Sequence, residues 1–503
     1  MNTANRIYLI IILSIASLLL FYNLDNQYLW QDEAETAVLA RNVFKFGLPK
    51  AFDGKNTILL MELPDLSNNY FPGWVWMGQP WLGIYVTHLS FRAFGINTFA
   101  ARLPFALFGL LSIFATYLTA QRLFKDRALS NIAVLLISFS VPFILHARQC
   151  RYYSLGILLM VLSLYLYLDY LEKKKFSELK LLIILFLLIN TSISYFLSAI
   201  TAIIAHLYFS DRRSFLSKRN IIFFLAALSY SAPILYLFKL PRRLSQFDVE
   251  WIFHNIKYYI RSINRYIFPW RAFIVLYLVY AVKKRRRCLP LSDNEKRPVL
   301  LLAFFILSAF PYLIFVNFNT LRYVIHLVPF LFILEAWIFS RLMRRFKYIA
   351  VLVVLPLALF TNVLSISKPV ASYLSGYIYE ITHDYDGPEE GIVKFLQKNA
   401  KPGDVVKIPH CADNATMFYT DLKVNNLPPF DGRTYPEWII PRLEWNRSEF
   451  YDSDYYKEIK KRYDEITIPY PDIRWENRPD DMGYHKFKTD TLAPRIKIYR
   501  RRD

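Results

Sequence analysis

Cysteine and glycine are scarce in this 503-residue chain, which contains three cysteines and 14 glycines. Cys150, Cys288 and Cys411 are too few for a disulfide framework, and their spacing is not that of metal ligands. The glycines do not form the clustered loop with which nucleotide-binding proteins cradle phosphate. These absences argue against a disulfide-stapled domain, a zinc-binding module and a P-loop enzyme.

Charged residues are also few, at 20% of the chain, whereas 55% of the residues are hydrophobic and 17% are aromatic. The mean hydropathy of +0.23 excludes a disordered chain and is unusual for a soluble protein. The formal net charge of +21 would suit nucleic acid, but the basic residues fall mainly in short loops between apolar blocks. Because membrane topology explains that placement, we expect no nucleic-acid partner.

Apolar blocks of about 17–22 residues recur up to residue 366, and each can cross roughly 30 Å of hydrocarbon as a helix. The sequence therefore predicts an all-α polytopic membrane protein. Eleven spans are expected, at residues 6–22, 99–120, 128–145, 153–171, 179–194, 195–210, 220–238, 266–282, 298–316, 323–340 and 348–366.

The loops between these blocks sort by charge. Alternate loops are rich in Lys and Arg, and the positive-inside rule places them in the cytoplasm together with the amino terminus. The first loop, residues 23–98, the loop 239–265 and everything after residue 366 are then expected on the outer face. The basic residues of loop 239–265 are candidates for binding lipid headgroups or ligand.

Residues 367–503 differ from the rest of the chain, because they are rich in Asp, Glu, Pro, Tyr and Lys and lack a span-length apolar run. Gly-Pro-Glu-Glu at 387–390 suits a helix amino terminus, and the apolar run at 404–408 is typical of a strand. The sequence predicts two domains: a transmembrane domain at 1–366 and a small soluble α/β domain at 367–503 on the outer face.

Acidic residues are nearly absent from the apolar blocks. Glu335 is the exception at mid-block, where an ion-coupled transporter would place a carboxylate. The alternative is that Glu335 pairs with a donor on a neighbouring span. Transport is therefore the lesser interpretation of the chain.

The first outer loop contains an acidic helix signature directly after the first span. Asp32, Glu33 and Glu35 precede an apolar face of helical spacing, with Asp32 as the expected N-cap and Gly47 as the expected C-terminal cap. One interpretation is that these acids only complement the helix dipole. The other is that a carboxylate beside the membrane acts as a base on a substrate with a lipid tail.

Arginines occur at the outer ends of two spans, against the positive-inside bias. They are Arg148 and Arg151 before the fourth span and Arg322 at the tenth, next to Tyr152 and Tyr323. Arginine and tyrosine at span ends often serve only as interfacial anchors. Because guanidinium matches phosphate oxygens in a bidentate fork, an anionic ligand is the alternative.

Taken in order, these motifs resemble the GT-C superfamily of membrane glycosyltransferases. The resemblance is to the branch that contains dolichyl-phosphate-mannose protein mannosyltransferases and the lipid A aminoarabinose transferase, and it covers about residues 5–345. It rests on Asp-Glu-Ala at 32–34, Arg41 and Asn42 with Gly47, Ala-Arg-Leu-Pro at 101–104, Arg-Tyr-Tyr at 151–153 and Arg-Tyr at 322–323.

The resemblance implies an enzyme that transfers a hexose or pentose from a polyprenyl-phosphate carrier, with inversion, on the periplasmic side of the inner membrane. A glycan or lipid of the cell envelope is the implied acceptor. Asp32 matches the family's acidic position and would be the general base, with Glu33 orienting the site. The donor phosphate would contact Arg148, Arg151, Arg322, Tyr152 and Tyr323.

The chain departs from the aminoarabinose-transferase branch at Gly-Gln-Pro-Trp, residues 78–81, which replaces a Glu-Lys-Pro-Pro motif. The lysine expected near the donor phosphate is therefore replaced by Gln79. No cofactor is required by the motifs, although carboxylates and cations of this kind can share a divalent cation. The competing functional hypotheses are a lipid-linked-oligosaccharide flippase and a non-enzymatic membrane scaffold.

Overall fold

A computed structural model of the chain describes most of its residues. The chain forms two compact units. Unit 1 comprises Met1–Tyr22, Phe105–Arg148 and Tyr152–Ile378, and unit 2 comprises Asn23–Pro104, Gln149–Arg151 and Tyr379–Asp503. The described residues are 3–59, 70–210, 212–238, 249–275, 278, 292–313, 319–346, 356, 373–408, 410–425, 435–442, 453–473, 478 and 485–502.

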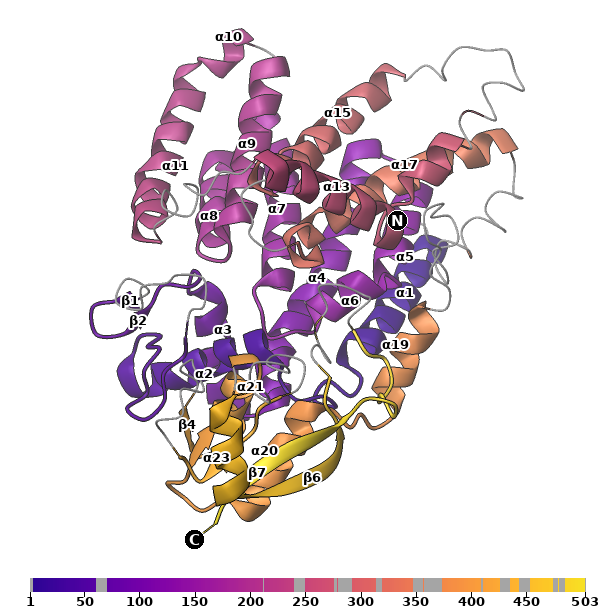
Figure 1. Cartoon of the computed structure of the whole chain (residues 1–503). Helices are drawn as coiled ribbons and strands as arrows, with labels where there is room; N and C mark the ends of the chain where they lie inside the picture. Colours follow the sequence, from indigo (N-terminus) through magenta and orange to yellow (C-terminus); the bar gives the residue numbers. More distant parts are fainter. Residues whose placement is uncertain are drawn as a thin grey trace. The chain divides into compact units, whose positions relative to one another are not determined.

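Unit 1 is built from helices (Figure 1). Its helices up to residue 210 are α1 (Thr3–Phe21), α4 (Thr98–Phe124), whose first turns belong to unit 2, α5 (Arg127–Ser138), α6 (Val141–Ala147), α7 (Tyr153–Leu171), α8 (Ser177–Ile189) and α9 (Ile193–Ser210). The later elements are α10 (Arg212–Phe215), α11 (Lys218–Leu237), α13 (Val249–Tyr266), α15 (Asp293–Leu307), α16 (Phe310–Leu313), η2 (Leu321–Tyr323), η3 (Ile325–Leu327) and α17 (Val328–Phe346).

Six helical segments among the described residues are long and apolar enough to cross a membrane, or seven if the bent pair α5 and α6 forms one span. The expectation of a polytopic helical membrane protein is therefore confirmed in outline. The predicted span 153–171 coincides with α7, and the expected tight turn near Thr191 separates α8 from α9. Most of the predicted span 348–366, and residues 276–277 and 279–282 of the predicted span 266–282, lie outside the described residues.

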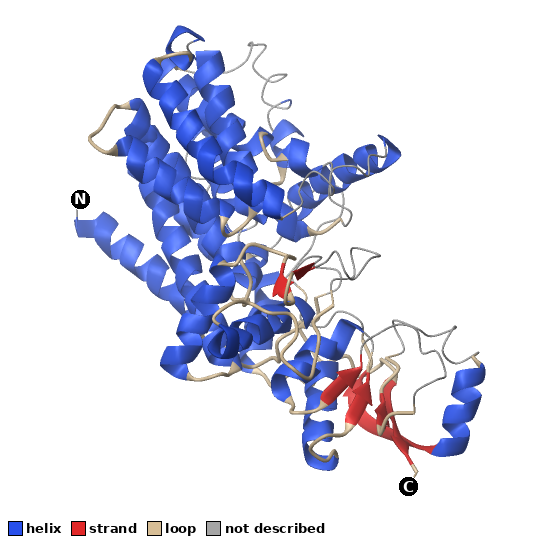
Figure 2. Ribbon diagram, turned by 90° about the vertical axis from the view of Figure 1, so that its left-hand side faces the viewer, coloured by secondary structure: helices blue, strands red, loops and turns tan. Residues whose placement is uncertain are grey.

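Unit 2 contains residues 23–104, which include the first long loop, and the C-terminal residues. Its elements are α2 (Gln31–Phe46), β1 (Tyr70–Phe71), β2 (Val75–Trp76), α3 (Leu82–Phe94), the end of α19 (Tyr373–Thr382), α20 (Pro388–Asn399), β3 (Val405–Lys407), α21 (His410–Tyr419), β4 (Lys423–Asn425), β5 (Trp438–Ile439), α23 (Asp454–Arg462), β6 (Tyr463–Pro471) and β7 (Arg495–Arg501). The strands of the larger sheet are the red arrows near the C terminus in Figure 2.

This sheet has the order β4-β3-β5-β7-β6. Strand β3 runs parallel to β4 and β5, with Val406 opposite both Val424 and Trp438, whereas β7 is antiparallel to β5 and β6. The predicted helix at 387–390 is α20, which begins with Pro388 in its first turn, and the predicted strand at 404–408 contains β3. The expected small α/β arrangement is therefore confirmed.

A buried charge network joins three elements of the C-terminal part. Arg442 is completely buried, donates from Nε to Asp472 Oδ1 at 2.8 Å and lies 3.6 Å from Glu389 Oε1. Burial raises the pKa of Glu389, and the nearby Arg442 guanidinium only partly offsets that effect. The ionised form of Glu389 is therefore less favourable in the folded protein than in water.

Glu389→Gln should make the stability of the protein less sensitive to pH. A carboxyl group whose pKa is raised by folding favours the folded state below its ordinary pKa, and this contribution is lost as pH rises through the raised value. We expect the variant to match the native protein at pH 4 and to unfold at a higher temperature than the native protein at pH 8. Thermal unfolding in detergent at both pH values measures this, and a variant selectively destabilised at pH 8 would contradict it.

Candidate functional site

Helix α2 presents the acidic residues of the loop 23–98. It begins at Gln31 and has Trp30 as its N-cap, without a side-chain capping bond, so the expectation that Asp32 is the N-cap is wrong. Asp32 and Glu33 instead lie in the first turn, where their charge complements the unpaired N–H groups. The helix ends as expected at Gly47, which has a left-handed φ of 69° and donates to Val43 O.

Glu33 anchors the first turn of α2 inside unit 2. Its side chain is completely buried, and Arg102 donates to both of its carboxylate oxygens, at 2.8 Å from Nε and 2.7 Å from Nη2. The backbone N–H of Cys150 also donates to Glu33 Oε1 at 2.8 Å. The remaining Arg102 nitrogen, Nη1, donates to the carbonyl oxygens of Leu24 and Gln27. This bidentate pair joins three segments distant in sequence and fixes the rotation of α2.

Cys150 is excluded as a nucleophile by its surroundings. The residue is completely buried, and burial together with the nearby Glu33 charge raises the pKa of its thiol to about 12. Because the thiolate is the reactive form, a thiol of this pKa is inert near neutral pH. Cys150 therefore contributes its backbone N–H to the scaffold of Glu33.

Arg151 lies over the opposite side of the same helical turn. Its Nη1 donates to Glu35 Oε1 at 2.9 Å, to Asp32 O at 3.0 Å and to Thr36 Oγ1 at 3.1 Å, while Nη2 lies 3.6 Å from Asp32 Oδ2. The side chain of Asp32 is 21% exposed, whereas that of Glu33 is not exposed at all. The two neighbouring acids thus have different environments, and the Asp32 carboxylate is the one that a reactant can reach.

Gln79 approaches this group from the loop before α3. Its Nε2 lies 3.5 Å from Thr36 Oγ1, the hydroxyl that Arg151 also contacts. Gln79, which replaces the lysine of the aminoarabinose-transferase branch, is therefore next to Arg151 in unit 2. Glu35, Thr36 and Arg102 belong to the same arrangement, although sequence reasoning did not place any of them among the catalytic or donor-binding residues.

A second group of predicted site residues gathers in unit 1, around Tyr195 at the start of α9. Tyr152 packs edge-on against Tyr195 with ring centroids 5.8 Å apart, and Tyr195 Oη donates to Arg322 O at 3.0 Å. The Arg322 guanidinium lies 5.2 Å from the ring centroid of Tyr323. Tyr152, Arg322 and Tyr323, which are distant in sequence, are therefore brought together as a cationic and aromatic group.

The close approach of α7 and α9 makes this second group possible. A Cβ atom added to Gly156 in α7 would lie 2.6 Å from the ring of Tyr195, which is closer than packed carbon atoms can come. Glycine at position 156 therefore allows the Tyr195 ring to reach the start of α7. No sequence motif signalled this requirement.

Arg148 has other neighbours in unit 1. Its Nη1 donates to Tyr377 Oη at 2.6 Å and to Leu19 O at 3.3 Å, and its guanidinium lies 5.8 Å from the Tyr377 ring centroid. These contacts tie the end of α6 to α1 and α19. They also fit the interfacial-anchor interpretation of Arg148.

The described residues contain no group of three His, Cys, Asp or Glu side chains that could hold a metal ion. Glu335, the intramembrane carboxylate, lies in α17 and is 1% exposed. The most reactive arrangement is consequently the partly exposed Asp32 carboxylate held by Arg151. Such a carboxylate can accept a proton from a hydroxyl group, and the guanidinium keeps its orientation.

Comparisons with known proteins agree with the motif-based resemblance. A model of the dolichyl-phosphate-mannose-protein mannosyltransferase family matches residues 78–237. The crystal structure of ArnT from Cupriavidus metallidurans bound to undecaprenyl phosphate is similar over 98% of this chain and 98% of that chain, with a TM-score of 0.57 and 12% identity. The apo state of the same protein covers 99% and 98%, with a TM-score of 0.56 and 14% identity.

An uncharacterized protein from Aquifex aeolicus is 26% identical over 159 residues, which are 31% of this chain and 28% of that relative. The match thus spans less than a third of the relative's length.

The expected resemblance to GT-C glycosyltransferases is confirmed, because a segment of the chain matches the mannosyltransferase model and the chain shares the ArnT fold. The chain is a multi-pass membrane protein of that fold.

Proposed function

We propose that the protein transfers a sugar from a polyprenyl-phosphate carrier to a hydroxyl group of a glycan or lipid acceptor, on the periplasmic face of the inner membrane. ArnT, whose fold this chain shares, binds undecaprenyl phosphate. The family model that matches residues 78–237 describes mannosyltransferases that use dolichyl-phosphate-mannose. Both comparisons support a lipid-linked phosphate as the carrier.

Asp32 is the general base in this proposal. Its carboxylate takes the proton of the acceptor hydroxyl as the hydroxyl oxygen attacks the anomeric carbon of the sugar. The bond from that carbon to the phosphate oxygen breaks on the opposite side, so the anomeric configuration inverts. The bonding electrons leave with the polyprenyl phosphate, whose negative charge nearby guanidinium groups stabilise.

The observation that carries the proposal is that the adjacent acids Glu33 and Asp32 lie in different environments. Glu33 uses both carboxylate oxygens inside a buried bidentate pair, whereas Asp32 stays partly exposed while Arg151 restrains it. A residue that only complements a helix dipole does not need this support on both sides of the turn. Glu33 is then a positioning residue, and Asp32 is the residue that meets the substrate.

The donor phosphate is assigned to Arg148, Arg151, Arg322, Tyr152 and Tyr323. Arg151 has a further role here, because it also orients Asp32. Arg322 and the two tyrosines form the group around Tyr195, where the Arg322 guanidinium lies against the ring of Tyr323. Charged and hydroxyl donors of this kind bind phosphate oxygens well.

Arg322→Ala should raise the donor KM by roughly tenfold or more, because a charge-assisted hydrogen bond to phosphate is lost. The measurement is the initial rate of polyprenyl-phosphate release as donor concentration is varied. Arg462→Ala, which removes an exposed arginine from α23, is the control and should not change this KM. An unchanged donor KM in Arg322→Ala would remove Arg322 from the phosphate site.

The transfer itself is tested by incubating purified protein with a panel of undecaprenyl-phosphate-linked hexoses and pentoses. We expect one donor to release undecaprenyl phosphate in a reaction that requires Asp32. A flippase would instead move the donor across a vesicle membrane and leave it intact. Transport without release, or release that persists fully in Asp32→Asn, would contradict the proposal.

A further inference from the structure

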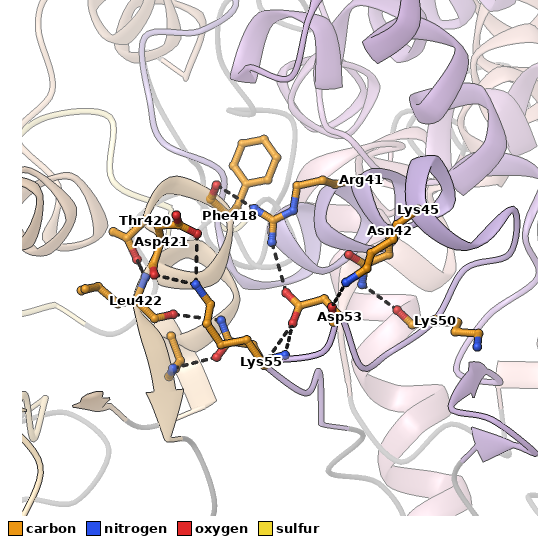
Figure 3. Close-up of polar contacts among 12 residues, drawn as sticks. Arg41, Asn42, Lys45, Lys50, Asp53, Lys55, Phe418, Thr420, Asp421 and Leu422 are labelled. Carbon is orange, nitrogen blue, oxygen red and sulfur yellow. Dashed lines mark hydrogen bonds and ion pairs between the residues drawn. The ribbon is translucent and has the colours of Figure 1, made fainter. Parts of the chain in front are cut away.

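The C-terminal residues of unit 2 contact the first outer loop along α21 and β4. Helices α2 and α21, separated by more than 360 residues in sequence, lie side by side (Figure 1). Arg41 Nη1 donates to Phe418 O at 3.4 Å (Figure 3). The rings of Phe418 and Phe91 stack with their centroids 6.1 Å apart. The helix that carries Asp32 is therefore packed against the C-terminal sequence.

The loop after α2 is held by the same C-terminal segment. Lys55 Nζ pairs with Asp421 Oδ1 at 3.0 Å (Figure 3). Asn56 Nδ2 donates to Leu422 O at 3.0 Å, and Asn56 Oδ1 accepts from Val424 N at 2.8 Å. The Asn56 amide thus pairs with the backbone of β4 much as a neighbouring strand would, and it is buried. This contact fixes the position of β4 and α21 beside the loop.

Tyr419, the last residue of α21, contacts the approach to the catalytic helix. Its hydroxyl accepts a hydrogen bond from Leu29 N at 2.9 Å and shares another with Thr98 Oγ1 at 2.7 Å. Its ring lies 4.4 Å from the ring of Tyr28. Leu29 is three residues before Asp32 and completely buried, so its N–H depends on this partner inside the protein.

A second α21 residue contacts the first residue of α2. Asn414 Nδ2 lies 3.5 Å from Gln31 O, and Asn414 is completely buried. Residues 29 and 31, on the path into Asp32, are consequently both contacted by one helix of the C-terminal sequence. Glu33, just after Asp32, is held by Arg102. The catalytic acid thus lies between two separately anchored points.

We propose that Tyr419 is a positioning residue for Asp32, an inference that rests on the proposed function. Without the hydroxyl, the buried Leu29 N–H would lose its acceptor, and the segment 28–31 would move to satisfy it. Movement of that segment displaces Asp32 relative to the reacting hydroxyl. A misplacement of about 1 Å can cost roughly a hundredfold in rate without changing substrate binding.

Tyr419→Phe removes only this hydroxyl. We expect kcat for polyprenyl-phosphate release from the undecaprenyl-phosphate donor used by the native protein to fall by about tenfold or more. The donor KM should stay within about twofold, because Tyr419 is not assigned to the donor phosphate. Tyr463→Phe is the matched control: Tyr463 Oη donates to Pro436 O at 2.6 Å, so this variant loses a comparable buried hydrogen bond in the same unit. Tyr463→Phe should lose about as much thermal stability as Tyr419→Phe and keep the kcat of the native protein.

The outcomes separate the two claims. If the native protein releases polyprenyl phosphate and Tyr419→Phe retains its kcat, the positioning role is wrong and the proposed function stands. Equal losses of kcat in the Tyr419 and Tyr463 variants would also overturn the role, because they would report general destabilisation. If the native protein releases no polyprenyl phosphate, the proposed function fails and the inference fails with it.

Thr98→Val provides a second, independent variant. It removes the other partner of the Tyr419 hydroxyl and leaves the Leu29 bond in place. We expect a smaller fall in kcat than in Tyr419→Phe, again with the donor KM unchanged. A larger fall would show that the Leu29 contact is not what positions the acid.

Discussion

Asp32→Asn is expected to lower kcat for polyprenyl-phosphate release by roughly 10²- to 10⁴-fold, the usual contribution of a general base. An amide has the shape of the carboxylate but cannot accept the proton of the attacking hydroxyl. Arg151 keeps its bonds to Glu35, to Thr36 and to the backbone oxygen of residue 32. The folded structure should therefore survive, and its thermal unfolding midpoint in detergent provides the check.

Glu35→Gln is the control for the charge around Arg151. Glu35 makes the shorter contact to the guanidinium, at 2.9 Å, and its side chain is 15% exposed. Because Glu35 orients Arg151 but does not act as the base, this variant should lower kcat for polyprenyl-phosphate release by about tenfold or less. The assignment is wrong if Glu35→Gln abolishes release while Asp32→Asn keeps most of it.

Arg102→Met should have the largest effect on stability. The substitution leaves the Glu33 carboxylate completely buried without its charged partner, and such losses typically cost about 3–5 kcal/mol. It also removes the hydrogen bonds that Arg102 donates to the carbonyl oxygens of Leu24 and Gln27. We expect a strongly lowered unfolding midpoint or loss of folded protein during purification.

Two companion variants identify the cause. Arg102→Lys keeps the charge but lacks the planar fork, so it should recover only part of the stability. Adding Glu33→Gln to Arg102→Met removes the unpaired charge and should also recover part of the stability. If the double variant were no more stable than Arg102→Met alone, packing of the arginine rather than the buried carboxylate would explain the loss.

Sequence patterns predicted the parts of the fold that depend on local chemistry. An uninterrupted apolar run specifies a spanning helix, and for this reason the predicted limits of 153–171 equal those of α7. Gly47 ends α2 as predicted, because a left-handed residue is needed there. The error over the N-cap is also local: Asp32 has the chemistry of a cap, but the N-cap is Trp30, two residues earlier, and the helix begins at Gln31.

Long-range pairing could not be predicted in the same way. The residue types at 33 and 102 are visible in the sequence, and Arg102 belongs to a motif on which the resemblance rested. Their bidentate contact joins positions 69 apart, and nothing in local periodicity selects that partner among the other arginines. The roles of Tyr419 and Asn56 were missed for the same reason, since a single tyrosine or asparagine in a polar segment carries no distinctive signal.

The discontinuous composition of unit 2 has a consequence for biosynthesis. The hydrogen bond between Leu29 and Tyr419 closes a loop of 390 positions, so a segment translated long after α2 completes the surroundings of Leu29. Contacts of such separation form late, because the entropy of closing the loop must be overcome first. A nascent chain that has not yet reached residue 419 would lack the α21 partner of the segment before Asp32, although Glu33 could already pair with Arg102. Under the proposed function, the full surroundings of Asp32 would then form only after α21 has been translated, which would delay the onset of sugar transfer.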